Sequence, residues 1–206
     1  NNQLTEITIP NSVTSIEREA FANNELTEVK IPDSVQYIGN NAFSRNGLIN
    51  ITIPDSVEYI GDKAFFANEL ENIAIPDSIT NIGVYAFQNN NLTDVTISNS
   101  INTISAGAFS DNFLTSVTIP EEVVRIDSAA FSHNLLTQIT IPDSVKYIEA
   151  SAFSRNKLKF VDIPDSVITL GPSAFTYNEL TKVEIPNSVT IIYNRVFSNN
   201  QLIILS

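Results

Sequence analysis

The chain has 206 residues, of which 43% are hydrophobic, and its 23 acidic and 11 basic residues give a net charge of -12. This apolar content is too high for a disordered chain, and the negative charge argues against nucleic acid and anionic membrane surfaces as partners. We find no apolar run long enough for direct membrane insertion, and without cysteine there are no disulfides and no thiol chemistry.

The sequence repeats itself every 22 residues. Leucine, phenylalanine and asparagine each recur at this interval, from Leu4 to Leu202, from Phe21 to Phe197 and from Asn24 to Asn200. A period of roughly 20 to 30 residues is typical of a solenoid, in which each repeat is one coil stacked on the last. We therefore expect one elongated domain over residues 1–206, built from about nine repeats.

The first predicted element of each coil is a short strand. If the leucine is position 1, apolar residues stand at positions 1, 4 and 6, as in Leu26, Val29 and Ile31, with Thr-rich neighbours between them. This alternation predicts a strand with one buried face. Position 7 is proline in eight of nine coils, and it ends the strand because proline cannot donate to a ladder.

The rest of each coil predicts a turn, a second extended segment and a closing bend. Asp or Asn followed by Ser forms the turn, and apolar residues at positions 10 and 13 indicate a shorter extended segment on the opposite wall. Glycine at position 14 in four coils, as at Gly39, indicates a tight or left-handed bend. Ala-Phe at positions 17 and 18 predicts a helical or 3₁₀ turn that is too short for an α-helix.

The repeated pattern LTxVxIPxSVxxIGxxAFxxN resembles the BspA-like, or Treponema-type, leucine-rich repeat, and it covers essentially the whole chain. The resemblance implies a right-handed leucine-rich β-solenoid with short parallel strands. It also implies an exported bacterial surface protein that adheres to host proteins or matrix. Many members have a period of about 23 residues and a cysteine three residues after the Phe, whereas this variant has 22 residues and asparagine there.

The most regular polar feature is the asparagine at position 21. We interpret this column as a buried ladder, in which each amide satisfies backbone groups of its own and the next coil, in preference to a row of ligand-binding amides. The ladder comprises Asn24, Asn46, Asn68, Asn90, Asn112, Asn134, Asn156 and Asn178.

A second polar column is acidic and occupies position 8, as at Asp33 and Asp143. Carboxylates one coil apart are a ligand arrangement for calcium. Each Asp is followed by Ser in a turn, however, and asparagine replaces it at Asn99. A solvated turn is therefore the favoured interpretation.

The sequence contains no catalytic constellation, so we expect no enzymatic activity, no cofactor and no metal ion. His133, the only histidine, occupies a variable surface position and is predicted to be solvated. The glycines stand apart from one another and form no phosphate-binding loop.

The predicted binding surface is the outward face of the strand. Phe160 there is flanked by lysines, as in an interface hot spot, and a second stripe of candidates lies at position 20. The candidate protein-binding residues are Lys159, Phe160, Lys182, Glu184, Tyr177 and Arg155.

The extended strand face and the absence of a catalytic constellation favour a non-enzymatic protein-binding or adhesion module, and the family resemblance implies that it belongs to a bacterial cell-surface protein. We expect it to be extracellular, at the cell surface or cell wall, with a host or extracellular-matrix protein as its partner. The alternatives are a rigid spacer that presents a neighbouring module, and a docking element for a host iron protein in nutrient acquisition.

The two ends of the chain prompt two further expectations. Residues 202–205 are apolar on both faces, which predicts self-association through the C-terminal edge, or cover by another coil or a cap. The chain has no methionine and begins inside the tail of a repeat. We therefore expect a fragment of a longer protein whose other parts include caps, an export signal and an anchor.

Overall fold

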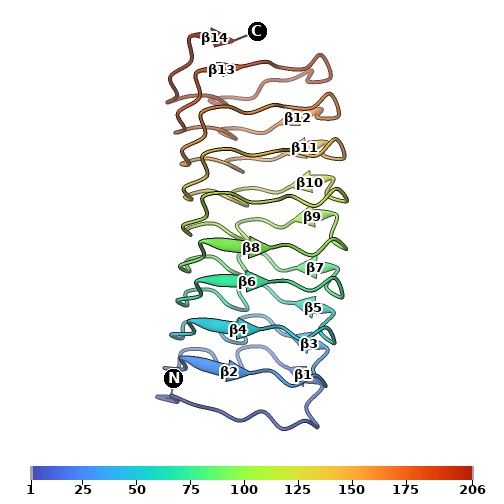
Figure 1. Cartoon of the computed structure of the whole chain (residues 1–206), viewed down its shortest axis with the longest axis vertical. Coiled ribbons are helices and arrows are strands. Elements are labelled where there is room, and N and C mark those ends of the chain that lie inside the picture. Colours follow the sequence, from blue (N-terminus) through green and yellow to red (C-terminus); the bar gives the residue numbers. More distant parts are fainter. Residues whose placement is uncertain (1, 206) are drawn as a thin grey trace.

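The computed structural model describes residues 2–205 as an elongated stack of coils, with the two termini at opposite ends (Figure 1). Neighbouring coils are related by one repeat. Ser15 pairs with Tyr37, and Ile16 pairs with Ile38, in a parallel ladder. The predicted leucine-rich β-solenoid with short parallel strands is confirmed.

The first wall of the stack is formed by strands that begin two residues after the repeat leucine. It is discontinuous, because the pairs β2–β4, β6–β8 and β13–β14 form separate parallel ladders. Between β8 and β13, Thr118 and Thr140 form an isolated parallel bridge. The strands are β2 (Glu28–Lys30), β4 (Asn50–Thr52), β6 (Asn72–Ala74), β8 (Asp94–Thr96), β13 (Lys182–Val183) and β14 (Ile204–Leu205).

The second wall is more continuous, although its strands are shorter. Two four-stranded parallel sheets follow one another along the stack. The first sheet contains β1 (Ser15–Ile16), β3 (Tyr37–Ile38), β5 (Tyr59–Ile60) and β7 (Asn81–Ile82). The second contains β9 (Thr103–Ile104), β10 (Arg125–Ile126), β11 (Tyr147–Ile148) and β12 (Thr169–Leu170).

Proline separates the two walls within each coil. Pro32 ends the first-wall segment, and its carbonyl accepts a hydrogen bond from Val35 N at 3.0 Å. This contact closes the turn that was predicted at Asp-Ser, and it sends the chain to the second wall.

The closing bend differs from the predicted helical or 3₁₀ turn, because it is a pair of turns and no helix occurs within residues 2–205. Ala42 N donates to Gly39 O and Ser44 N donates to Asn41 O, each at 3.1 Å. Asn41 and Arg45 have φ of 57° and 56°. Left-handed residues spaced in this way stop a right-handed helix from continuing.

Of the two bends expected at the position-14 glycines, the tight one occurs, since a turn begins at Gly39. The left-handed one does not, because the left-handed residues lie two and six positions further on. A Cβ on Gly61 would lie 2.5 Å from the backbone N of Asn40 in the preceding coil. Gly61 is therefore required by the close approach of two backbones, not by a positive φ.

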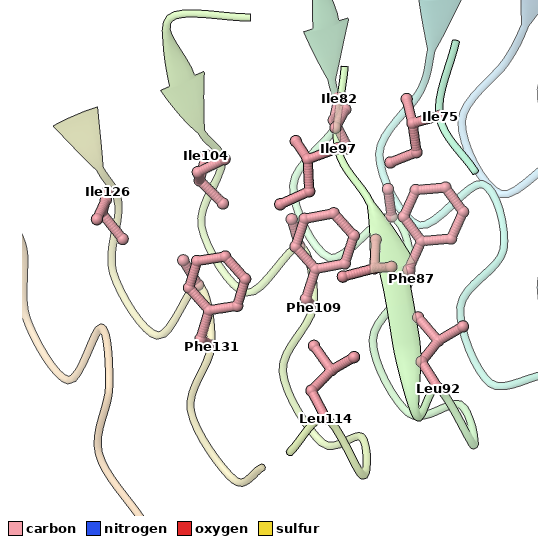
Figure 2. Packing of buried hydrophobic residues seen from close by; sticks show 14 of the residues in the cluster. Ile75, Ile82, Phe87, Leu92, Ile97, Ile104, Phe109, Leu114, Ile126 and Phe131 are labelled. Carbon is pink, nitrogen blue, oxygen red and sulfur yellow. The ribbon is translucent and has the colours of Figure 1, made fainter. Parts of the chain in front are cut away.

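The core is a column of side chains along the axis of the stack (Figure 2). Phe87, Phe109 and Phe131 are fully buried, and their rings stack with centroids 5.7 and 5.6 Å apart. Leu92 and Leu114 line the same column. Each coil thus buries its apolar side chains against the coils on either side.

Candidate interaction surface

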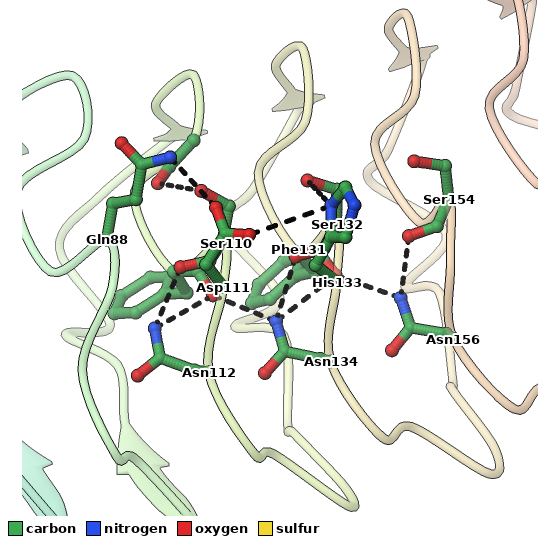
Figure 3. Close-up of polar contacts among 12 residues, drawn as sticks. Gln88, Ser110, Asp111, Asn112, Phe131, Ser132, His133, Asn134, Ser154 and Asn156 are labelled. Atoms are coloured by element: carbon green, nitrogen blue, oxygen red, sulfur yellow. Dashed lines mark hydrogen bonds and ion pairs between the residues drawn. The ribbon is translucent and has the colours of Figure 1, made fainter.

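The asparagine column lies inside the closing bend, where Figure 3 shows three of its members. Asn134 Nδ2 donates to Phe109 O at 2.9 Å and to Phe131 O at 3.3 Å, and its Oδ1 accepts from Leu114 N at 3.0 Å. Such an amide therefore joins its own coil to the preceding coil. The sequence pattern predicted a connection to the next coil instead. Within the described residues, every buried side-chain nitrogen and oxygen has a hydrogen-bond partner.

The acidic column at position 8 lies at the surface of the turns. Asp77 Oδ1 accepts a hydrogen bond from Asn99 N at 2.8 Å, so this carboxylate joins two neighbouring turns. Across residues 2–205, no group of three or more histidine and acidic side chains is placed to hold a metal ion. No helix in this part of the chain has the length and apolar character needed to cross a bilayer.

His133 lies on the closing bend and is half-exposed (Figure 3). Its Nδ1 is 3.8 Å from Asp111 Oδ1, and the other oxygen of Asp111 accepts from Gln88 Nε2 at 2.9 Å. The histidine is therefore part of a polar surface row that crosses three coils.

Four of the six predicted binding residues lie on or beside the first wall. Phe160 is 60% exposed, and Lys159 is exposed one residue before it. Lys182 Nζ lies 2.5 Å from Glu184 Oε1, and this hydrogen bond lowers the pKa of the Glu184 carboxyl. Lys182 is therefore paired within its own strand segment.

The other two predicted residues lie on the closing bend. The Arg155 guanidinium stacks over the Tyr177 ring at 4.5 Å from its centroid, and both residues have positive φ. The six candidates thus belong to two different elements, the first wall and the closing bend.

The last strand is exposed at the C-terminal end of the stack. Ile203 is 86% exposed and Ile204 is 52% exposed, whereas the side chain of Leu205 lies outside the described residues. Self-association through this edge stays a prediction.

The first wall also carries a groove that the sequence did not indicate. Its volume is about 690 Å³, and it runs over three consecutive coils beside Phe160. Glu121, Asp143 and Asp162 line it, together with Thr118, Thr140 and Pro142. We call this feature the acidic groove. The sequence contains one sign of this groove, because Asp162 stands at a position where the seven preceding coils carry threonine, alanine or lysine.

A groove of similar size, about 670 Å³, lies nearer the N-terminus on the same wall. Glu28, Lys30 and Asp33 line it, with Ile49 and Pro54. Its lining thus includes both signs of charge and no aromatic side chain. We call it the N-terminal groove.

The fold defines the chain as a leucine-rich repeat protein, and the comparison with protein families makes this assignment more specific. The chain belongs to the family described as BspA type leucine rich repeat region, whose model matches residues 1–114 and 102–205 with 6 copies. No curated protein sequence matches the chain.

Solved structures show the same architecture. A leucine-rich repeat protein from Bacteroides ovatus superposes with a TM-score of 0.81 at 31% identity, over 95% of this chain and 54% of that one. A leucine-rich repeat protein from Eubacterium ventriosum gives a TM-score of 0.59 at 27% identity, over 85% and 46%. YopM from Yersinia enterocolitica, at 20% identity and a TM-score of 0.52 over 89% and 46%, shares the fold. The chain thus spans about half the length of these proteins.

Proposed function

We propose that this chain is a non-catalytic protein-binding module of a bacterial cell-surface protein, and that it adheres to a host or extracellular-matrix protein through its first wall. The observation that carries the proposal is Phe160. Its ring is 60% exposed on a wall whose neighbouring outward positions are mostly polar. A large exposed aromatic side chain beside a groove is the usual anchor of a protein interface.

Family membership supports this proposal, because leucine-rich repeat proteins generally mediate contacts between proteins. The architecture supports it as well. A stack of coils presents the same position of every coil in one row, which creates an extended surface on a rigid support. Function on such a surface depends on the outward residues, and the core sequence can stay constant.

Binding to purified extracellular-matrix proteins, measured by surface plasmon resonance, tests the proposal. We expect Phe160→Ala to weaken binding about tenfold or more, because it removes the aromatic anchor. Phe113→Ala is the matched control, since Phe113 is also about half-exposed but lines neither groove. It should leave the affinity unchanged.

A rigid spacer is the second candidate function. The uninterrupted phenylalanine stack from Phe21 to Phe197 favours it, because the same ring contact joins every pair of neighbouring coils into one elongated stack. The same measurement separates the two functions. A spacer would bind none of the purified proteins, and a Phe160→Ala variant with the affinity of the unmodified chain would exclude the proposed surface.

A further inference from the structure

The acidic groove combines an open volume with one sign of charge. Glu121 and Asp143 occupy the same position in consecutive coils, and Asp162 projects from the first-wall segment of the third coil. All three carboxylates are exposed. No lysine, arginine or histidine is among the described residues that line the groove, and within residues 2–205 none of the three forms an ion pair.

Phe160 provides an apolar surface at one end of the acidic groove. It stands at position 3 of its coil, where the preceding coil has Gln138 and the one before it has Ser116. These two residues line the same groove, so the aromatic ring rises beside two shorter polar side chains. Pro142 and Thr140 also line the groove.

The size of the acidic groove fits a short extended peptide. It crosses three coils, and two coil spacings at about 4.8 Å span roughly 10 Å, the length of about three residues in an extended chain.

We propose that the acidic groove binds an extended cationic segment of a protein partner, with lysine or arginine side chains on the three carboxylates and an apolar side chain against Phe160. This inference rests on the proposed function and adds the chemistry of the partner. The net charge of -12 supports it, because a negative molecule attracts a cationic segment and accelerates its approach.

The N-terminal groove supplies a comparison within the same molecule. Glu28 occupies the position equivalent to Phe160, and Asp33 occupies the position equivalent to Asp143. Lys30 lines this groove, and its ammonium group repels a cationic ligand. We therefore expect the two grooves to differ in affinity although their volumes are similar.

Fluorescence anisotropy with a defined probe tests the proposal on the intact chain. The probe is a dye-labelled peptide with Lys-Phe-Lys between glycine and serine residues, and the comparison peptides carry Glu-Phe-Glu and Lys-Ala-Lys in its place. We expect the Lys-Phe-Lys peptide to bind, with an affinity that falls as salt is added. The Glu-Phe-Glu peptide should show no binding, and the Lys-Ala-Lys peptide should bind about tenfold more weakly.

Paired variants show which groove is responsible. Asp143→Asn combined with Asp162→Asn should weaken binding of the Lys-Phe-Lys peptide about tenfold, and Phe160→Ala should do the same. Glu28→Gln combined with Asp33→Asn removes the same amount of charge from the N-terminal groove, and it should leave the affinity within about twofold. Circular dichroism of each variant verifies that it is folded.

Three outcomes would overturn the proposal. The first is an equal loss of affinity in the two double variants, which would indicate diffuse attraction to a negative surface. The second is equal binding of the Glu-Phe-Glu and Lys-Phe-Lys peptides. The third is no binding of the Lys-Phe-Lys peptide. If a matrix protein binds the chain while the lysine peptide does not, the proposed function stands and the cationic partner is wrong. If both fail to bind, both proposals fall.

Discussion

At the scale of single residues, the asparagine column holds neighbouring coils together by satisfying backbone groups that the bend leaves without a partner. The Asn134 amide donates to Phe109 O and Phe131 O, and it accepts a hydrogen bond from Leu114 N. An apolar side chain of similar size at this position would fill the space and leave Leu114 N buried without a hydrogen bond. The two carbonyls each keep one donor, because Asn112 Nδ2 lies 3.2 Å from Phe109 O and Asn156 Nδ2 lies 2.9 Å from Phe131 O.

Asn134→Leu should therefore lower the free energy of unfolding by about 1–3 kcal/mol, the cost of one buried donor left without a partner. Urea denaturation followed by circular dichroism measures this change. Asn24→Leu is the control, because Asn24 is only half-buried in the terminal coil and water replaces the lost contacts. Equal effects of the two substitutions would contradict the role assigned to burial.

A second residue-scale prediction concerns pH. Asp127 lies partly buried near the ion pair of Arg125 with Glu149. Burial raises the pKa of the Asp127 carboxyl, and the Glu149 charge adds to this effect, although Arg125 lowers the pKa. Because folding raises this pKa, the stability associated with the protonated carboxyl is present at low pH and is lost as pH rises through the folded-state value.

Asp127→Asn should accordingly raise the Tm at neutral pH, and the gain should disappear below the ordinary Asp pKa of about 3.9. Thermal melts of both proteins across this range measure the difference. The exposed Asp143 supplies the control substitution Asp143→Asn, which should give a smaller change. A gain in Tm that grows on acidification would show that the sign of the pKa change is wrong.

At the scale of elements, the phenylalanine stack distributes stability evenly along the inner coils. Phe109 is fully buried between Phe87 and Phe131, so Phe109→Ala leaves a cavity that two rigid neighbours enclose. We expect the free energy of unfolding to fall by about 3 to 5 kcal/mol, as measured by chemical denaturation.

Phe197→Ala gives the matched comparison at the end of the stack. Phe197 is only partly buried and stacks on Phe175 alone, so its loss should cost clearly less. The two costs should differ because the stability of a repeat protein is approximately a sum of contacts between neighbouring coils, and Phe109 contributes to two such contacts while Phe197 contributes to one. A cost at Phe197 as large as that at Phe109 would mean that the coils do not contribute in this way.

The walls and the core could be predicted from the sequence because their residues repeat. Val29, Ile31 and Phe43 occupy positions that are apolar in every coil, and all three are buried. The closing bend could not be predicted in detail. Its left-handed positions hold residues as different as Tyr85, Ala129 and Arg155, so they carry no turn signature.

Backbone hydrogen bonds between coils permit this variety of side chains at the left-handed positions. The N–H of a left-handed residue donates to a carbonyl of the next coil, as Ala129 N does to Ala150 O at 2.9 Å. This inter-coil hydrogen bond offsets the cost of a positive φ, about 1–3 kcal/mol for a residue other than glycine. The contact exists only in the assembled stack, and a local sequence pattern does not reveal it.

The candidate site was predicted in part for a similar reason. Phe160 stands out because it interrupts a polar column. The acidic groove beside it brings together residues from three coils, and their carboxylates occupy two different positions of the repeat. In the sequence, Glu121 and Asp143 share one column and Asp162 belongs to another, whereas the folded stack places all three around one groove.

At the scale of the whole molecule, we infer that the repeat of 22 residues is the unit of folding. Each coil is added in the register set by its neighbours, and the walls, the phenylalanine stack and the asparagine column share this register. The outward surface varies along the same frame, so the proposed binding site does not disturb the core.

Deletion of one coil tests this statement most directly, with unfolding by urea followed by circular dichroism as the measurement. Removal of residues 92–113 takes out one whole repeat and should leave a folded, cooperative and slightly less stable rod. Removal of residues 92–102 takes out half a repeat, which misaligns the phenylalanine and asparagine columns, and it should abolish cooperative unfolding. If the two shortened chains behaved alike, whether both folded or both unfolded, the 22-residue coil would not be the unit that builds this protein.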